Sequence, residues 1–205
     1  DALADDLRAE SRALTDRVLF DLDDDWLSIF TWGESYLTPA LAAHYGLPAQ
    51  SQPGWAAYPA DRGSGILTHG TFLSIGAKFG DTSPTVRGYE MYKRIVCGSL
   101  GTIPANIDVD TPPGQATDCK PERYSMDETP GCEGCHAITD GAGFGLENYG
   151  VAGAWRTVEP QNPNSPSPRP DRGTVSPTAA RRSWARCSPT TRACPRVRRP
   201  SCFAS

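Results

Sequence analysis

The sequence predicts a mostly α-helical fold, in which small helical domains are joined by long loops. Three observations carry this prediction. Apolar residues recur at helical spacing near the N-terminus, Pro-containing caps precede two further apolar segments, and the stretches between them are rich in Pro, Gly and Asp.

The first 20 residues have one apolar stripe with charged residues between its members. Leucines and a valine recur at multiples of three to four residues, which predicts an amphipathic helix: Leu3, Leu7, Leu14 and Val18. The acidic run 21–25 then interrupts the pattern, and we expect the aromatic segment 26–30 to pack into the core.

Helix signals of the same kind recur along the chain. Thr38-Pro39 starts a helix that ends at Gly46, and Ser83-Pro84 starts a helix over 84–97. Residues 65–75 are predicted to form a helix that contains His69.

These elements suggest four segments along the chain. Residues 1–50 form a helical segment at the end of a preceding domain, and 51–130 form a helical region with a Pro-rich loop over 98–130. Residues 131–159 hold the motif described next, and 160–205 form an Arg/Pro-rich tail.

Composition limits the classes of function. The net charge of −4 combines a tail holding nine Arg and one acidic residue with a body, residues 1–159, of net charge −12. A body this acidic does not favour nucleic acid. The sequence contains no run of 18 apolar residues, so it predicts no membrane span. The chain begins at Asp1, which suggests a mature chain or a fragment.

The chemistry of the chain centres on Cys132-Glu133-Gly134-Cys135-His136. Two thiols three residues apart, followed by an imidazole, form the attachment pattern of c-type haem, with Cys132 and Cys135 as thioether residues and His136 as the proximal iron ligand. A zinc site that adds Cys119 and a structural or redox dithiol are the alternatives.

Neither His nor Met follows His136, so the second axial ligand of such a haem comes from upstream in the chain, from a missing segment or from another chain, or is absent. The candidates are His69, His44 and Met126, and an open iron site is the alternative. Cys97 and Cys119 flank the long loop and form either a disulfide or two free thiols.

The tail beyond Pro160 lacks apolar periodicity, so it cannot bury enough surface to order itself. A basic arm for anionic partners and a frameshift product of a GC-rich gene are the two interpretations, and the second is favoured.

Several motifs, in order, resemble the C-terminal half of the planctomycete-type cytochrome c-like proteins, which are large exported bacterial proteins catalogued as domains of unknown function. They fall between residues 20 and 158 and lie at 41–47, 62–68, 82–88, 132–137, 143–148 and 153–156. Asp140-Gly141 replaces the Asp-Pro that is usual in the family, and Gly150 replaces an acidic residue.

The resemblance implies covalent haem c, a periplasmic or otherwise exported location, and preceding N-terminal domains. We therefore expect an electron-transfer module with an unknown redox partner. A haem enzyme with an open iron site, peroxidase- or oxygenase-like, and a zinc-stapled structural module are the alternatives.

Overall fold

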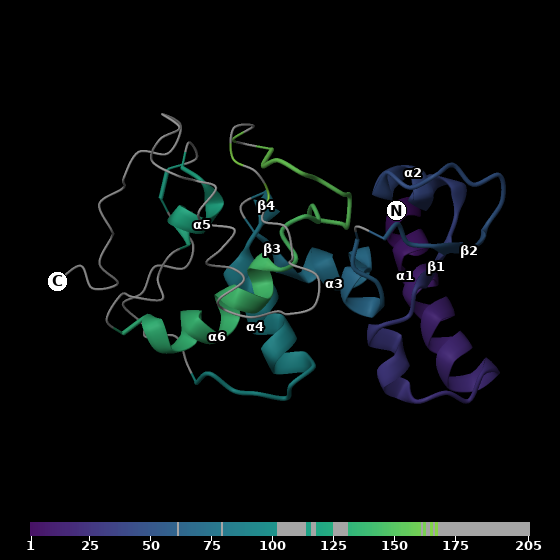
Figure 1. Cartoon of the computed structure of the whole chain (residues 1–205), viewed down its shortest axis with the longest axis horizontal. Coiled ribbons are helices and arrows are strands. Elements are labelled where there is room, and N and C mark those ends of the chain that lie inside the picture. The colour runs from purple at the N-terminus through teal and green to yellow at the C-terminus, as the bar shows by residue number, and fades with distance from the viewer. Residues whose placement is uncertain are drawn as a thin grey trace. The chain divides into compact units, whose positions relative to one another are not determined.

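The computed structural model describes residues 1–60, 62–78, 80–101, 114–115, 118–124, 131–160, 162, 165 and 167. Within this part the chain is built from helices and a few short strands, which confirms the mostly α character that the sequence predicts (Figure 1). In the described part, no helix is long and apolar enough to cross a membrane.

The chain divides into two compact units that exchange segments. Unit 1 comprises residues 1–75 and 149–155, and unit 2 comprises 76–148 and 156–205. These boundaries differ from the four segments expected from composition, because the unit division follows contacts rather than changes in residue usage.

Unit 1 is built on α1, which spans Ala2–Asp16. The Asp1 side chain accepts a hydrogen bond from the Leu3 backbone N–H and caps the helix. The helix continues as a single π-helical segment, η1 (Arg17–Asp21). The predicted stripe is confirmed, because its last three members, Leu7, Leu14 and Val18, are buried.

The aromatic segment that follows is not a core element. It forms a 3-10 helix, η2 (Trp26–Phe30), whose Trp26 and Leu27 side chains are more than half exposed. The expectation of core packing is wrong here, because none of the five residues is buried, although the Trp26 and Phe30 rings make an edge contact.

A helix and a hairpin complete the core of unit 1. The helix α2 (Pro39–Tyr45) has Thr38 as its cap and ends at Gly46, which adopts a left-handed conformation with φ of 65°. Strands β1 (Glu34–Leu37) and β2 (Gly54–Ala57) pair antiparallel. Leu7 of α1 packs with residues of β1, α2 and the following turn: Leu37, Leu41, Ala42, Tyr45 and Leu47.

The predicted helix over 65–75 is broken into short pieces. A 3-10 turn, η3 (Ile66–Thr68), precedes α3 (Gly70–Leu73), and a second turn, η4 (Ser74–Gly76), follows. His69 lies between the first two pieces in an extended conformation with ψ of 141°, so the backbone changes direction at this residue.

Unit 2 contains a small hairpin and three helices. Strands β3 (Ala77–Lys78) and β4 (Asp81–Thr82) pair antiparallel. The helices are α4 (Pro84–Arg94), α5 (Lys120–Arg123) and α6 (Glu133–Phe144). The predicted start of α4 at Ser83-Pro84 is confirmed, and the helix ends three residues earlier than predicted.

Helices α4 and α6 lie side by side and cross closely (Figure 1). A Cβ added at Gly88 would collide with the backbone carbonyl of Thr139, and one added at Gly143 would collide with that of Pro84. The glycine-rich run 140–143, which the sequence suggests is a turn, is therefore helical, and Gly143 lets the two backbones approach.

Candidate functional site

The Cys-Glu-Gly-Cys-His motif lies at the start of α6. Cys132 occupies the residue before the helix, and Cys135 and His136 lie in its first turn. Cys132 is buried, with 9% of its surface exposed, whereas Cys135 is exposed and its thiol is free. A Cβ added at Gly134 would meet no atom within 4 Å, so space is open beside the motif.

The imidazole of His136 is hydrogen-bonded to a carboxylate through one of its two ring nitrogens. Its Nδ1 lies 2.8 Å from Oδ2 of Asp140, one helical turn further on. A histidine that ligates a metal commonly donates its other ring N–H to a carboxylate, which fixes the tautomer. This arrangement leaves Nε2 as the nitrogen for a ligand.

The cysteines correct one expectation. Cys97 is an exposed free thiol, so the Cys97–Cys119 disulfide is not formed. Cys97 has a φ of 56° just after the C-terminus of α4, a backbone conformation that few side chains adopt. Cys119 and Cys132 are both disulfide-bonded.

A covalent haem requires two free thiols and an imidazole that can reach the iron. Cys135 and His136 fit, because one is a free exposed thiol and the other has an oriented ring with partial exposure of 22%. Cys132 fits only in its reduced form, because a sulfur in a disulfide cannot also form a thioether.

The zinc alternative receives less support. Among the residues that the structure describes, no group of three or more His, Cys, Asp or Glu side chains could hold a metal ion. Cys119 and Cys132, two members of the expected zinc set, are in the disulfide state, and thiolates are the form that binds zinc.

The candidates for the second axial ligand have other contacts. His44 Nε2 lies 3.0 Å from the backbone oxygen of Ala152. His69 is fully buried, with Nδ1 3.1 Å from the Ser11 hydroxyl and Nε2 3.8 Å from Glu10 Oε1. Met126 lies outside the described residues.

His69 belongs to a buried polar cluster of unit 1 centred on Glu10. The Glu10 carboxylate accepts hydrogen bonds from Ser35 at 2.5 Å, from Tyr45 at 2.6 Å and from Tyr58 at 3.3 Å. Burial raises the pKa of Glu10 to about 7 despite these donors, and burial lowers the pKa of His69 to about 4. Near pH 5.5 both side chains are therefore neutral in the folded protein.

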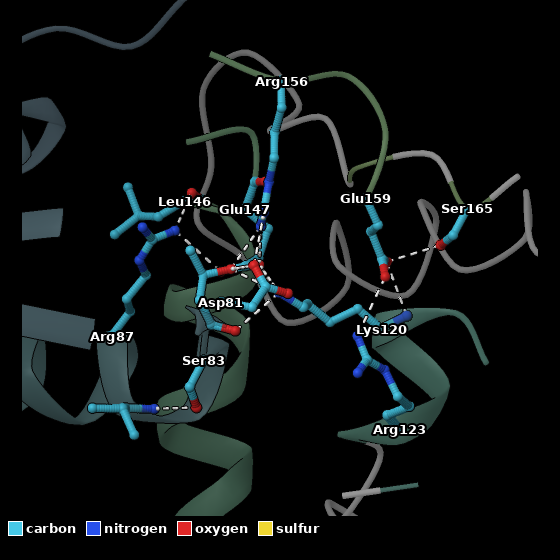
Figure 2. A network of polar contacts seen from close by, with 12 residues as sticks. Asp81, Ser83, Arg87, Lys120, Arg123, Leu146, Glu147, Arg156, Glu159 and Ser165 are labelled. Atoms are coloured by element: carbon cyan, nitrogen blue, oxygen red, sulfur yellow. Dashed lines mark hydrogen bonds and ion pairs between the residues drawn. The ribbon is translucent and has the colours of Figure 1, made fainter. Parts of the chain in front are cut away.

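Unit 2 contains a buried ion network that the sequence analysis missed. Figure 2 shows Lys120, Arg87 and Arg156 converging on Glu147 and Asp81. The Lys120 ammonium donates to Asp81 at 2.8 Å and to Glu147 at 3.0 Å. Arg156 donates to the same two carboxylates at 2.9 and 2.8 Å.

The network keeps the Asp81 carboxylate ionised inside unit 2. Burial alone would raise the pKa of Asp81, but the hydrogen bonds and charges of Lys120 and Arg156 outweigh it and hold this pKa below its ordinary value. Glu147 is fully buried and also pairs with Arg87 at 3.2 Å.

Three of the motifs that carry the family resemblance supply this network. Thr82 and Arg87 come from the motif at 82–88, Glu147 from 143–148, and Arg156 from 153–156. The charged residues within these motifs were the sequence signal that could have indicated a buried ion network. Their partners, Asp81 and Lys120, lie outside the motifs, and sequence spacing alone does not pair them.

A Cys-X-X-Cys-His sequence at the start of a helix is typical of cytochrome c-like domains. Residues 63–159 match the family model PSCyt3, described as a protein of unknown function (DUF1588). Over this part of the chain, the match confirms the resemblance to the planctomycete cytochrome c-like domains. No curated protein and no solved structure matches the chain.

Proposed function

We propose that the chain binds one haem covalently and acts in electron transfer. Cys132 and Cys135 would form the two thioethers, and His136 would be the proximal ligand. The observation that supports this most directly is the placement of the motif at the start of α6, with His136 Nδ1 already held by Asp140. When bound, the haem supplies a one-electron redox centre.

The disulfide state of two cysteines supports an exported location. Cys119 and Cys132 are disulfide-bonded, and disulfides persist outside the cytoplasm, where c-type haem is also attached. Cys132 has to be a free thiol before it can form a thioether. Maturation of this site therefore needs an external dithiol, which is oxidised to its own disulfide while Cys132 and its partner sulfur return to thiols.

The test of covalent attachment is the intact mass of the protein after periplasmic expression with a cytochrome c maturation system. We expect a mass increase of one haem that survives acid-acetone extraction, with a matching pyridine-haemochrome spectrum. Cys132→Ala and Cys135→Ala should each leave one thioether. A colourless protein that carries one zinc ion would overturn the proposal and favour the zinc module.

Cys97→Ala is the matched control for the motif cysteines. Cys97 and Cys135 are both exposed free thiols, but only Cys135 belongs to the motif. Cys97→Ala should therefore leave the haem mass unchanged. Loss of one thioether in this variant, as in Cys135→Ala, would show that general thiol chemistry, not the motif, directs attachment.

The second axial ligand separates an electron carrier from a haem enzyme. His69 faces Ser11 and Glu10 through its two ring nitrogens, and His44 faces a backbone oxygen. If either residue serves as ligand, it has to leave these contacts. An electron carrier with both axial positions filled should not bind carbon monoxide when reduced, whereas rapid binding would favour the enzyme.

A further inference from the structure

Three polar side chains form a continuous line behind the motif histidine. His136 Nδ1 lies 2.8 Å from Asp140 Oδ2, and Asp140 Oδ1 accepts a hydrogen bond of 2.7 Å from the hydroxyl of Thr85. Asp140 is buried, with 6% of its surface exposed. Oδ1 also accepts a longer hydrogen bond of 3.2 Å from the Thr139 hydroxyl, so both oxygens of this carboxylate have partners.

The line joins two helices that are held together closely. His136 and Asp140 lie one turn apart on α6, and Thr85 lies in the first turn of α4. Thr85 can reach Asp140 because Gly88 and Gly143 allow the two backbones to approach. The carboxylate is thus fixed by an element other than the one that carries it, and its position does not depend on α6 alone.

The chemistry of the line selects one tautomer of the imidazole. A carboxylate can only accept hydrogen bonds, so Nδ1 of the neutral ring carries the proton and Nε2 keeps its lone pair. A negative partner on Nδ1–H also makes Nε2 a stronger electron donor.

We propose that Asp140, held by Thr85, is the positioning residue that fixes the tautomer and ring orientation of His136 for iron. This inference rests on the proposed haem attachment. Stronger donation from the proximal nitrogen stabilises oxidised iron, so Asp140 would lower the reduction potential of the bound haem.

Asp140→Asn tests this role with little change in shape. A carboxamide can either accept or donate toward Nδ1, so it no longer selects a tautomer. In the haem-loaded protein we expect a more positive reduction potential and a lower Fe–His stretching frequency. Asp5→Asn is the charge control, because it makes the same substitution at an exposed position outside the motif; both readouts should stay at their original values.

The tautomer of His136 can also be measured in the protein without haem. The chain has three histidines, so His136→Ala identifies the His136 signals in ¹⁵N spectra of the apoprotein. The original protein should show His136 in the Nδ1–H tautomer only, and Asp140→Asn should show both tautomers. Thr85→Val should also give a mixture, and Thr85→Ser, which keeps the hydroxyl, should restore the single tautomer.

The outcomes separate this role from haem binding itself. An original protein that carries no haem after maturation overturns the proposed function, and with it the role of Asp140 toward iron. If haem is attached but Asp140→Asn leaves both the potential and the tautomer unchanged, the positioning role alone is wrong. Should Asp140→Asn fail to fold, the Thr85→Val and Thr85→Ser pair decides by the same readouts.

Discussion

At the scale of single residues, Glu147 balances charge that burial would otherwise exclude from the interior of unit 2. Its carboxylate accepts from Arg87 and Lys120, which are almost fully buried, and from Arg156. Asp81 shares two of these cations. The three positive groups therefore depend on two carboxylates, and each carboxylate has more than one partner.

Glu147→Gln should leave this network with one carboxylate for three cations. Removing one member of a buried ion network typically costs about 3–5 kcal/mol. We expect a loss of this size in the free energy of unfolding of unit 2, measured by urea unfolding. Glu90→Gln is the control, because Glu90 pairs with the exposed Arg94 on α4, and its loss should cost less than about 1 kcal/mol.

Glu10 and His69 give unit 1 a pH dependence that one substitution should reveal. The pKa of Glu10 rises on folding from 4.5 to about 7, so its stabilising contribution is lost as the pH rises through this range. The pKa of His69 falls from 6.5 to about 4, so its contribution is lost as the pH falls. Between pH 4.5 and 6.5 the two effects oppose each other, and stability should change little.

His69→Gln removes one side of this balance. The variant should lose about 3 kcal/mol of unfolding free energy between pH 4.5 and 7, since a shift of one pKa unit corresponds to about 1.4 kcal/mol. Glu10→Gln should show the opposite slope and lose stability as the pH falls from 6.5 to 4. Parallel slopes in the two variants would contradict the assignment.

At the scale of elements, the sequence predicts where helices start better than it predicts the backbone conformation of glycine-rich segments. Caps at Thr38 and Ser83 are local signals, because the side chain bonds to a backbone N–H three residues away, and both are confirmed. The glycines of 140–143 suggest a turn by composition. Their helical state depends on α4, which lies some 50 residues earlier in the chain, and no local pattern reports that contact.

Gly88→Ala tests the close crossing of α4 and α6. The added methyl group would meet the Thr139 carbonyl, so the helices have to separate, and overpacking of this kind costs about 1–3 kcal/mol. Thermal unfolding of the apoprotein should show this loss. Gly134→Ala, in open space on α6, should be neutral or slightly stabilising. Equal effects of the two changes would show that the crossing tolerates a side chain.

At the scale of the whole molecule, the candidate site shows where sequence reasoning stops. The five-residue motif predicts Cys132, Cys135 and His136 because attachment chemistry is local. Asp140 and Thr85 were not singled out, because their roles arise only when two helices meet. The sequence also left open whether Cys97 and Cys119 form a disulfide, because pairing depends on distance in space.

Two truncations test how much of the C-terminal region unit 2 needs. Glu159 is buried; it accepts from the Lys120 backbone N–H at 2.9 Å and pairs with Arg123 at 3.4 Å, and Ser165 donates to it. A chain that ends after Ser167 retains these contacts and should keep its thermal stability and haem mass. A chain that ends after Val158 leaves buried groups unpaired and should lose about 1–3 kcal/mol. Indistinguishable melting of the two truncated chains would contradict this role of Glu159.

Each unit is built from two separate segments of the chain, and this limits which parts of the sequence can be transferred to another protein and still fold. The backbone passes between units three times, at 75/76, 148/149 and 155/156, and the family match over 63–159 includes all three crossings. Residues 149–155 pack on residues that precede the match, as in the contact of the Arg62 guanidinium over the Trp155 ring at 4.8 Å. A recombination event that moved only residues 63–159 would carry residues 149–155 without the preceding residues on which they pack. Duplication or fusion within this lineage should therefore retain the N-terminal residues together with the motif.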